Sequence, residues 1–266
     1  MLGREDRLIQ AVSDGRDALA RLREWQCDVV VAGQGRNGFD GLKLLRRVRA
    51  IQPEARVIVT GDGAPQRILA AIREGAYSYV HKPLAGGPLP DVVTQALASG
   101  PWQHDIRVVS AVPAWISLDV RSKLDAADRA AHFLRELSGD LPPQIRDDIT
   151  AALRELLMNA VEHGCKLDPR KWTRVALLRT PRSAIAHVHD PGKGFSLDML
   201  PHAAISNPDG SPIKHVDVRV EEGRRPGGFG ILMARNLVDE LLYNERGNSV
   251  LFVKYLDEKP ASGNPG

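Results

Sequence analysis

Three polar side chains, Glu155, Asn159 and His163, recur at intervals of four residues. This spacing places a carboxylate, a carboxamide and an imidazole along one stripe of an α-helix. The opposite stripe is apolar and contains Ile149, Ala152, Leu153, Leu156 and Ala160. A helix with this pattern buries one side against a core and presents groups capable of chemistry from the other.

A second candidate for chemistry lies where an apolar run ends. Residues 184–188 are apolar except for one His, and after Asp190 the chain enters a turn that contains Gly192 and Gly194. The pattern predicts a strand followed by a loop. Glycines in such a loop let the backbone approach a ligand closely.

A third candidate is a glycine-rich segment. Gly227, Gly228, Phe229 and Gly230 come directly before residues 231–238, which have the length and apolar content of a helix. The N-terminus of a helix carries unpaired N–H groups and a positive dipole end, and together these hold phosphate. The segment is therefore a candidate phosphate-binding loop.

In this order and spacing, the three segments resemble the ATP-binding fold shared by DNA gyrase, Hsp90-type chaperones, sensor histidine kinases and MutL. The resemblance is closest to the branch of bacterial anti-sigma-factor serine kinases. It covers residues 115–256 and implies a two-layer α/β sandwich that binds ATP and Mg²⁺.

The resemblance also implies roles for single residues. Asn159 would hold the magnesium ion that bridges the phosphates, and Asp190 would accept a hydrogen bond from the adenine amino group. Residues 195–226 are expected to form a mobile lid over the nucleotide. The remaining expected nucleotide-binding residues are His163, Gly192 and Gly194 beside the nucleotide, and Gly227, Gly228, Phe229 and Gly230 closing over the phosphates.

Glu155 decides which branch of the fold is expected. A carboxylate one helical turn before Asn159 can take a proton from water or from a hydroxyl that attacks the terminal phosphate. Sensor histidine kinases usually have Asn at this position and carry their phosphoacceptor His on a separate helix pair far upstream. We interpret His132, only 27 residues before Asn159, as an ordinary helix residue. The expected catalytic residue is Glu155.

The first hundred residues alternate short apolar strands with helices, the pattern of a parallel α/β sheet. They resemble the receiver domain of response regulators, a flavodoxin-like fold. Matching details are Asp40 after a strand, Thr60 at the end of the next strand, and Lys82-Pro83, a predicted cis-proline turn. The predicted strands are Leu8–Val12, Asp28–Ala32, Arg56–Thr60 and Ser78–Val80.

Two features set this segment apart from a working receiver. Gly33 stands where the phosphoacceptor Asp is expected, and the first strand is missing together with its helix and the acidic pair that binds magnesium. The aspartyl-phosphate switch is therefore expected to be lost. The absent strand is central in a sheet of order 2-1-3-4-5. Either the start site of the chain has been misjudged, or the gap is filled by residues 1–7 or by another subunit. We expect a homodimer.

The expected organisation is a degenerate receiver over residues 1–100, a linker over 101–114, the kinase domain over 115–256 and a disordered tail over 257–266. Charge is balanced, with 36 Lys plus Arg against 33 Asp plus Glu, so direct nucleic-acid binding is not expected. No apolar run is long enough for a membrane span and no leader is seen, which indicates a cytoplasmic protein.

The resemblance favours an ATP-dependent protein serine/threonine kinase of the anti-sigma type. Its expected substrate is a STAS-type anti-sigma-factor antagonist, with an RNA polymerase sigma factor as a further partner. Two alternatives stay open. One is a non-catalytic binding module gated by nucleotide, and the other is a histidine-kinase-like transmitter of a two-component system.

Overall fold

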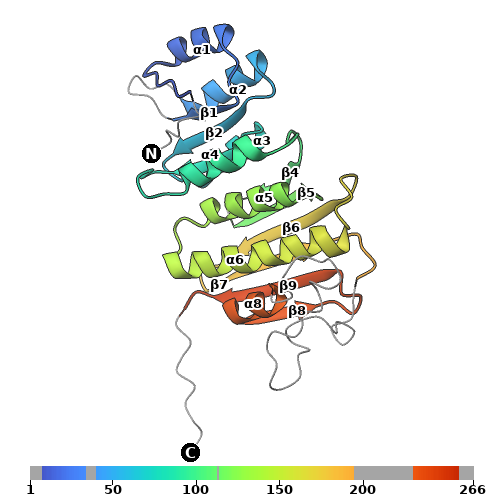
Figure 1. Ribbon diagram of the computed structural model, residues 1–266. Coiled ribbons are helices and arrows are strands. Elements are labelled where there is room, and N and C mark those ends of the chain that lie inside the picture. The colour runs from blue at the N-terminus through green and yellow to red at the C-terminus, as the bar shows by residue number, and fades with distance from the viewer. Residues whose placement is uncertain (1–7, 34–39, 113, 195–229, 258–266) are drawn as a thin grey trace, which may run out of the picture. The chain divides into compact units, whose positions relative to one another are not determined.

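The computed structural model describes residues 8–33, 40–112, 114–194 and 230–257. The chain divides into two compact units, Met1–His104 and Asp105–Gly266. Figure 1 shows a small sheet with helices in the first unit and a larger sheet with helices on one face in the second. Among the described residues, no helix is both long and apolar enough to cross a membrane.

The first unit is built on a three-stranded parallel sheet of order β1-β2-β3. This confirms the predicted parallel α/β architecture. The Asp14 and Asp40 side chains accept hydrogen bonds from the first turns of α1 and α2, and such caps begin helices. The Lys82–Pro83 peptide bond is cis, as predicted. The elements are α1 (Gly15–Glu24), β1 (Val29–Ala32), α2 (Gly41–Ile51), β2 (Arg56–Gly61), α3 (Pro65–Arg73), β3 (Ser78–His81) and α4 (Leu89–Ala98).

Residues Leu8–Val12 are not a strand, so this prediction was wrong. Leu8 is 78% exposed and Ile9 is 52% exposed, which shows that the segment has no apolar surface to pack against. The strand that would lie between it and β1 in a complete receiver sheet is absent from the described residues. Among the described residues β1 is therefore an edge strand, and Leu8–Val12 does not pair with it.

Position 33 follows β1 and lies against β2. A Cβ atom placed on Gly33 would be 2.9 Å from Oγ1 of Thr60, which is itself buried. A side chain at position 33 therefore needs Thr60 to move. The prediction that this position does not accept a phosphoryl group rests on the missing side chain of Gly33 and stays a prediction.

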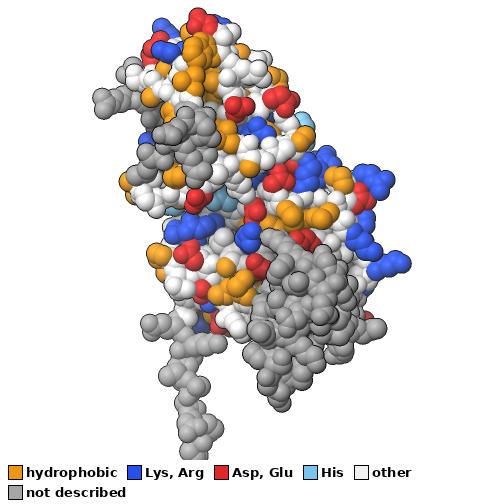
Figure 2. All heavy atoms as spheres, viewed as in Figure 1, with side chains coloured by type: hydrophobic (Ala, Val, Ile, Leu, Met, Phe, Trp, Pro, Cys, Tyr) orange, Lys and Arg blue, Asp and Glu red, His pale blue; other side chains and the backbone are white. Residues whose placement is uncertain are grey.

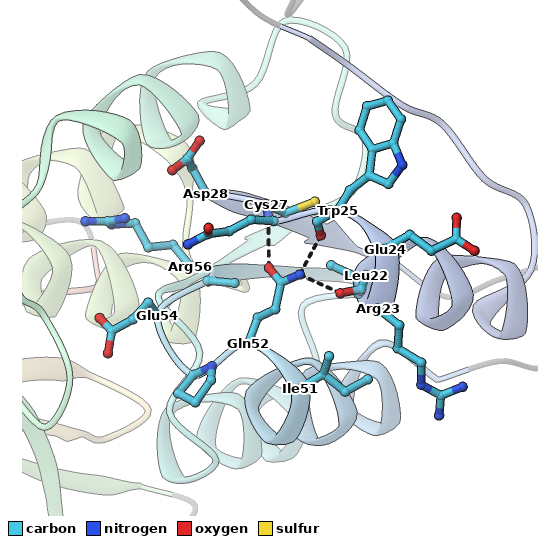
Figure 3. A pocket seen from close by; sticks show the side chains of 13 residues that line it. Leu22, Arg23, Glu24, Trp25, Cys27, Asp28, Ile51, Gln52, Glu54 and Arg56 are labelled. Atoms are coloured by element: carbon cyan, nitrogen blue, oxygen red, sulfur yellow. Dashed lines mark hydrogen bonds between the residues drawn. The ribbon is translucent and has the colours of Figure 1, made fainter.

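The first unit also contains a hollow of about 540 Å³ between the end of α1 and the turn that joins α2 to β2 (Figure 3). The Gln52 side chain spans it, donating to the carbonyls of Leu22 and Trp25 and accepting from the N–H of Cys27. The hollow lies at the amino ends of β1 and β2. Gly33 and Thr60 lie at their carboxyl ends, so it is not the position of a receiver's phosphorylation site.

The second unit is a six-stranded antiparallel sheet of order β4-β5-β6-β7-β9-β8. Helices α5, α6 and α8 lie on one face (Figure 1), which confirms the predicted two-layer α/β sandwich. Alternating residues such as Ala184, Ala186 and Val188 of β7 are buried, as expected for a sheet with one covered face. The elements are β4 (Ile106–Val112), β5 (Trp115–Arg121), α5 (Leu124–Leu137), α6 (Pro143–Asn159), the π-helical turn η1 (Ala160–Gly164), β6 (Trp172–Arg179), β7 (Ser183–His189), α8 (Gly230–Leu237), β8 (Glu240–Tyr243) and β9 (Ser249–Tyr255).

The segment 101–114, predicted to be a linker, is mostly folded structure. Trp102 is buried in the first unit, where its ring meets that of Tyr77 edge-on at 5.5 Å. Residues 106–112 form β4, which pairs with β5 as an antiparallel hairpin. Pro101 and Pro113 suggested a linker, but each borders an ordered element.

Helices α5 and α6 pack side by side, and ion pairs join them. Arg135 pairs with Asp147 at 2.8 Å, and Arg154 pairs with Asp128 at 2.6 Å. Figure 2, viewed from the helical side of the second unit, shows acidic and basic side chains interspersed over this face. The apolar stripe predicted for α6 is buried as expected, including Ile149, Leu153 and Leu156.

Candidate functional site

Asp190 directly follows β7, and its side chain is buried at the start of the next loop. One carboxylate oxygen, Oδ1, accepts a hydrogen bond from the N–H of Gly192 at 2.8 Å. No donor from the described residues pairs with the other oxygen, Oδ2. Burial raises the pKa of Asp190 above its ordinary value, while the Gly192 N–H acts in the opposite direction. The site holds a partly desolvated acceptor, as recognition of an amino group requires.

Gly164 and Gly192 allow the backbone to close around Asp190. A Cβ atom on Gly164 would lie 2.2 Å from the Asp190 carboxyl carbon, and one on Gly192 would lie 2.5 Å from the Gly164 carbonyl oxygen. Both positions therefore exclude any larger residue. Gly192 was predicted from the sequence to permit close approach, whereas Gly164 was not. The sequence feature that could have identified Gly164 is its position directly after the polar stripe of α6.

The turn between β8 and β9 holds the Asp190 loop through hydrogen bonds. The Asn248 carbonyl accepts the Asp190 N–H at 3.0 Å, and its side-chain amide donates to the Asp190 carbonyl at 3.0 Å. Gly194 has φ +77, and a Cβ atom there would lie 1.7 Å from the Arg246 carbonyl oxygen. Sequence reasoning identified Gly194 and missed Asn248, which resembles any other hairpin residue until its contacts are seen.

Glu155 and Asn159 lie one turn apart near the end of α6, as predicted, and the N-terminus of α8 approaches both. A Cβ atom on Gly230 would be 2.8 Å from Glu155 Oε2 and 3.5 Å from Asn159 Nδ2. Only a residue without a side chain lets α8 begin this close without displacing these groups. The arrangement places a carboxylate and a carboxamide beside a helix N-terminus, where anions bind.

Asn159 fits the role of a magnesium ligand. Its side-chain nitrogen Nδ2 is buried and has no hydrogen-bond partner among the described residues. Such an orphaned group is costly unless a ligand pairs with it. Its carboxamide oxygen belongs to the hard oxygen ligands that Mg²⁺ prefers, usually in company with phosphate oxygens. The residues present therefore fit ATP with Mg²⁺.

The polar stripe does not continue to His163. Helix α6 ends at Asn159, and the π-helical turn η1 follows, closed by a hydrogen bond from the Cys165 N–H to the Ala160 carbonyl. The wider turn changes the direction of the side chains that follow it, and His163 is exposed. The predicted spacing of four was right for Glu155 and Asn159 but did not place His163 on the same α-helix.

Several predicted residues lie outside the described part of the chain. They are Gly227, Gly228 and Phe229 of the phosphate-binding loop, and the lid over residues 195–226. Their predicted roles stay predictions. Of the glycine-rich segment, Gly230 alone is described, as the first residue of α8.

Comparisons with known proteins agree with this arrangement. Residues 120–254, just over half of the chain, match the family described as the histidine kinase-like ATPase domain. Residues 1–94 match the response regulator receiver domain.

Curated relatives share only a short segment with this chain. The C4-dicarboxylate transport transcriptional regulatory protein DctD of Rhizobium meliloti is 32% identical over 82 residues, which is 30% of this chain and 18% of that protein. The transcriptional regulatory protein ZraR of Salmonella typhimurium is 31% identical over 85 residues, 32% of this chain and 19% of ZraR. AfsQ1 of Streptomyces coelicolor is 27% identical over 99 residues, 37% of this chain and 44% of AfsQ1. The chain spans less than half the length of each of these relatives. On the two family matches, the chain belongs to the histidine kinase-like ATPase family and carries a response regulator receiver domain ahead of its ATPase domain.

Proposed function

We propose that this ATPase domain is an ATP-dependent protein serine/threonine kinase of the anti-sigma-factor type. The observation that carries the proposal is the position of Glu155, one turn before Asn159 and next to the first residue of α8. A carboxylate at this position is placed to take a proton from a hydroxyl that attacks the terminal phosphate.

The proposed reaction uses this carboxylate as the base. The substrate hydroxyl gives its proton to the Glu155 carboxylate as its oxygen forms a bond to the terminal phosphorus of ATP. The bond from that phosphorus to the bridging oxygen breaks, and its electron pair leaves with ADP. Glu155 then returns the proton to water. A magnesium ion held with Asn159 would neutralise charge on the phosphates.

The proposed substrate is a STAS-type anti-sigma-factor antagonist, and an RNA polymerase sigma factor is a further proposed partner. Partner switching would follow, because the phosphorylated antagonist leaves and the domain is free to hold the sigma factor. The receiver domain would act through contacts, since Gly33 offers no group to phosphorylate. A homodimer is the proposed assembly.

The experiment is transfer of the labelled terminal phosphate of ATP to a STAS-type antagonist, with Glu155→Gln as the test variant. We expect ATP affinity to persist in the variant while transfer falls by on the order of 100-fold or more. The label on the antagonist should survive acid, as phosphoserine and phosphothreonine do. Equal transfer by both proteins would refute the role of Glu155. An acid-labile label would support a histidine-kinase-like transmitter. Nucleotide binding without phosphate transfer would support a non-catalytic module gated by nucleotide.

A further inference from the structure

The side chain of Glu155 on α6 contacts Arg154, which in turn pairs with Asp128. Its Oε1 atom lies 3.5 Å from NH1 of Arg154, and Arg154 Nε donates to Asp128 Oδ1 at 2.6 Å. Asp128 belongs to α5, so the contact runs from one helix to the next. Consecutive residues of a helix point about 100° apart, and Arg154 therefore has to bend along the surface to reach Glu155. Asp128 holds it in that bent position.

The two oxygens of the Glu155 carboxylate face different groups. Oε1 faces the Arg154 guanidinium, and Oε2 faces the start of α8, where a Cβ on Gly230 would lie 2.8 Å away. Arg154 is thus placed to fix the rotation of the carboxylate. Fixing it this way leaves Oε2 directed toward the place where α8 would hold phosphate.

We infer that the Asp128–Arg154 pair is a positioning device for Glu155, which orients the carboxylate for proton transfer. This inference rests on the proposed kinase function. The pair has little to offer stability, because the Arg154 side chain is 43% exposed and ion pairs at such sites contribute little. Orientation of a base matters more, since small displacements of a reacting group have large effects on rate.

The chain supplies a matched control. Arg135 and Asp147 form a second ion pair between α5 and α6, at 2.8 Å, in which the arginine side chain is 25% exposed. Among the described residues, the ion pairs of Arg135 and Asp147 do not include Glu155. Asp147→Asn therefore removes a link between the same two helices without touching the carboxylate.

The test compares phosphate transfer by the full chain with transfer by Arg154→Met, Asp128→Asn and Asp147→Asn. We expect kcat to fall by on the order of 10- to 100-fold in Arg154→Met and less in Asp128→Asn. The KM for ATP and the thermal midpoint should match those of Asp147→Asn, which should transfer phosphate normally. Transfer by Arg154→Met equal to that of Asp147→Asn would overturn the inference.

A charge-swapped variant separates positioning from stabilisation. Asp128→Arg combined with Arg154→Asp restores an ion pair between the helices but puts a carboxylate beside Glu155. A purely structural pair would recover wild-type transfer in this variant, which would overturn the inference. A positioning pair would leave transfer as low as in Arg154→Met, which would support it.

A readout without catalysis keeps this inference apart from the proposed function. The guanidinium ¹⁵N resonances of Arg154 should shift both in Asp128→Asn and in Glu155→Gln. If the wild-type chain binds ATP but transfers no phosphate to any antagonist, the proposed function fails. Resonances that then shift in neither variant show that the contact is absent in solution, and the inference fails too. If the resonances shift in both variants, the contact exists in solution, and Arg154 is a positioning residue for Glu155 in the reaction that the site performs.

Discussion

Replacing Asp190 by Asn changes one charge at the place where adenine recognition is expected. In the wild-type chain Oδ1 is engaged by the Gly192 N–H at 2.8 Å, which leaves Oδ2 to accept from the adenine amino group. The variant keeps the first interaction, because an amide oxygen also accepts. Its amide nitrogen would stand where Oδ2 was, so that a donor faces a donor.

The magnitude follows from the burial of this group. Asp190 is 8% exposed, and a buried hydrogen bond to a charged group contributes about 2 kcal/mol. The Kd for ATP should therefore rise roughly 30-fold. At a nucleotide concentration 100 times the wild-type Kd, the stabilisation by ATP should fall from about 2.7 to about 0.9 kcal/mol.

In the absence of nucleotide, Asp190→Asn should be as stable as the wild-type chain or more stable. Burial raises the pKa of Asp190, so the folded chain binds this proton more tightly than the unfolded chain. Its contribution to stability is therefore fully present only below the ordinary value of 3.8 and is lost as pH rises through the raised pKa. At pH 7 the ionised carboxylate is a cost that Asp190→Asn removes.

Calorimetry with ATP and Mg²⁺, together with thermal unfolding at pH 7, measures both effects. We expect weaker binding and an unfolding midpoint that is equal or higher in the absence of nucleotide. Asp119→Asn is the control, because Asp119 lies on β5 in an exposed pair with Arg174 at 2.8 Å and should leave ATP affinity unchanged. Unchanged affinity in Asp190→Asn would refute the assignment of the adenine site.

Three further predictions concern the glycine positions and the assembly. Gly230→Ala should fold, because the nearest atom to the added methyl group, at 2.8 Å, is the flexible end of the Glu155 side chain. The methyl group should displace that carboxylate and slow phosphate transfer by on the order of tenfold. Transfer at the wild-type rate would contradict the placement of Oε2. Acetyl phosphate should not label the wild-type chain, since Gly33 has no carboxylate, nor Gly33→Asp, since the acidic pair that binds magnesium is missing. A hydroxylamine-sensitive adduct in either would refute this. Light scattering on the full chain should give twice the mass of one chain, because the edge strand β1 is a ready site for pairing; a monomer at micromolar concentration would remove that proposal.

The elements that carry the site were predictable because each has a strong local signal. The α6 segment combines an apolar stripe with polar residues spaced by four, and β7 is an apolar run that ends at Asp190 and two glycines. These features depend on neighbours along the chain, so the sequence is sufficient to read them. Gly230 could be predicted for the same reason, as the glycine that begins an apolar helix.

What could not be predicted depends on contacts between distant segments. Leu8–Val12 has the apolar content of a strand, but in the structure it does not pair with the free edge of β1. The link from Asp128 through Arg154 to Glu155 joins residues of two helices, and Asp128 and Glu155 are 27 residues apart in the chain. Nothing in either segment alone indicates it. Asn248 likewise supports Asp190 from 58 residues away.

The π-helical turn η1 explains why the site needs an irregular end to α6. Asn159 must stay on the helix to lie beside α8, while five residues later Gly164 must press against the Asp190 carboxyl group. A regular helix through Gly164 would carry the chain straight on, along the axis that α6 already follows. The wider turn, which ends at a glycine with no side chain to intrude, lets one short segment reach both the proposed phosphate side at Asn159 and the proposed adenine side at Asp190. The deviation from helical spacing that displaced His163 from the predicted stripe is therefore part of how the two halves of the site are joined.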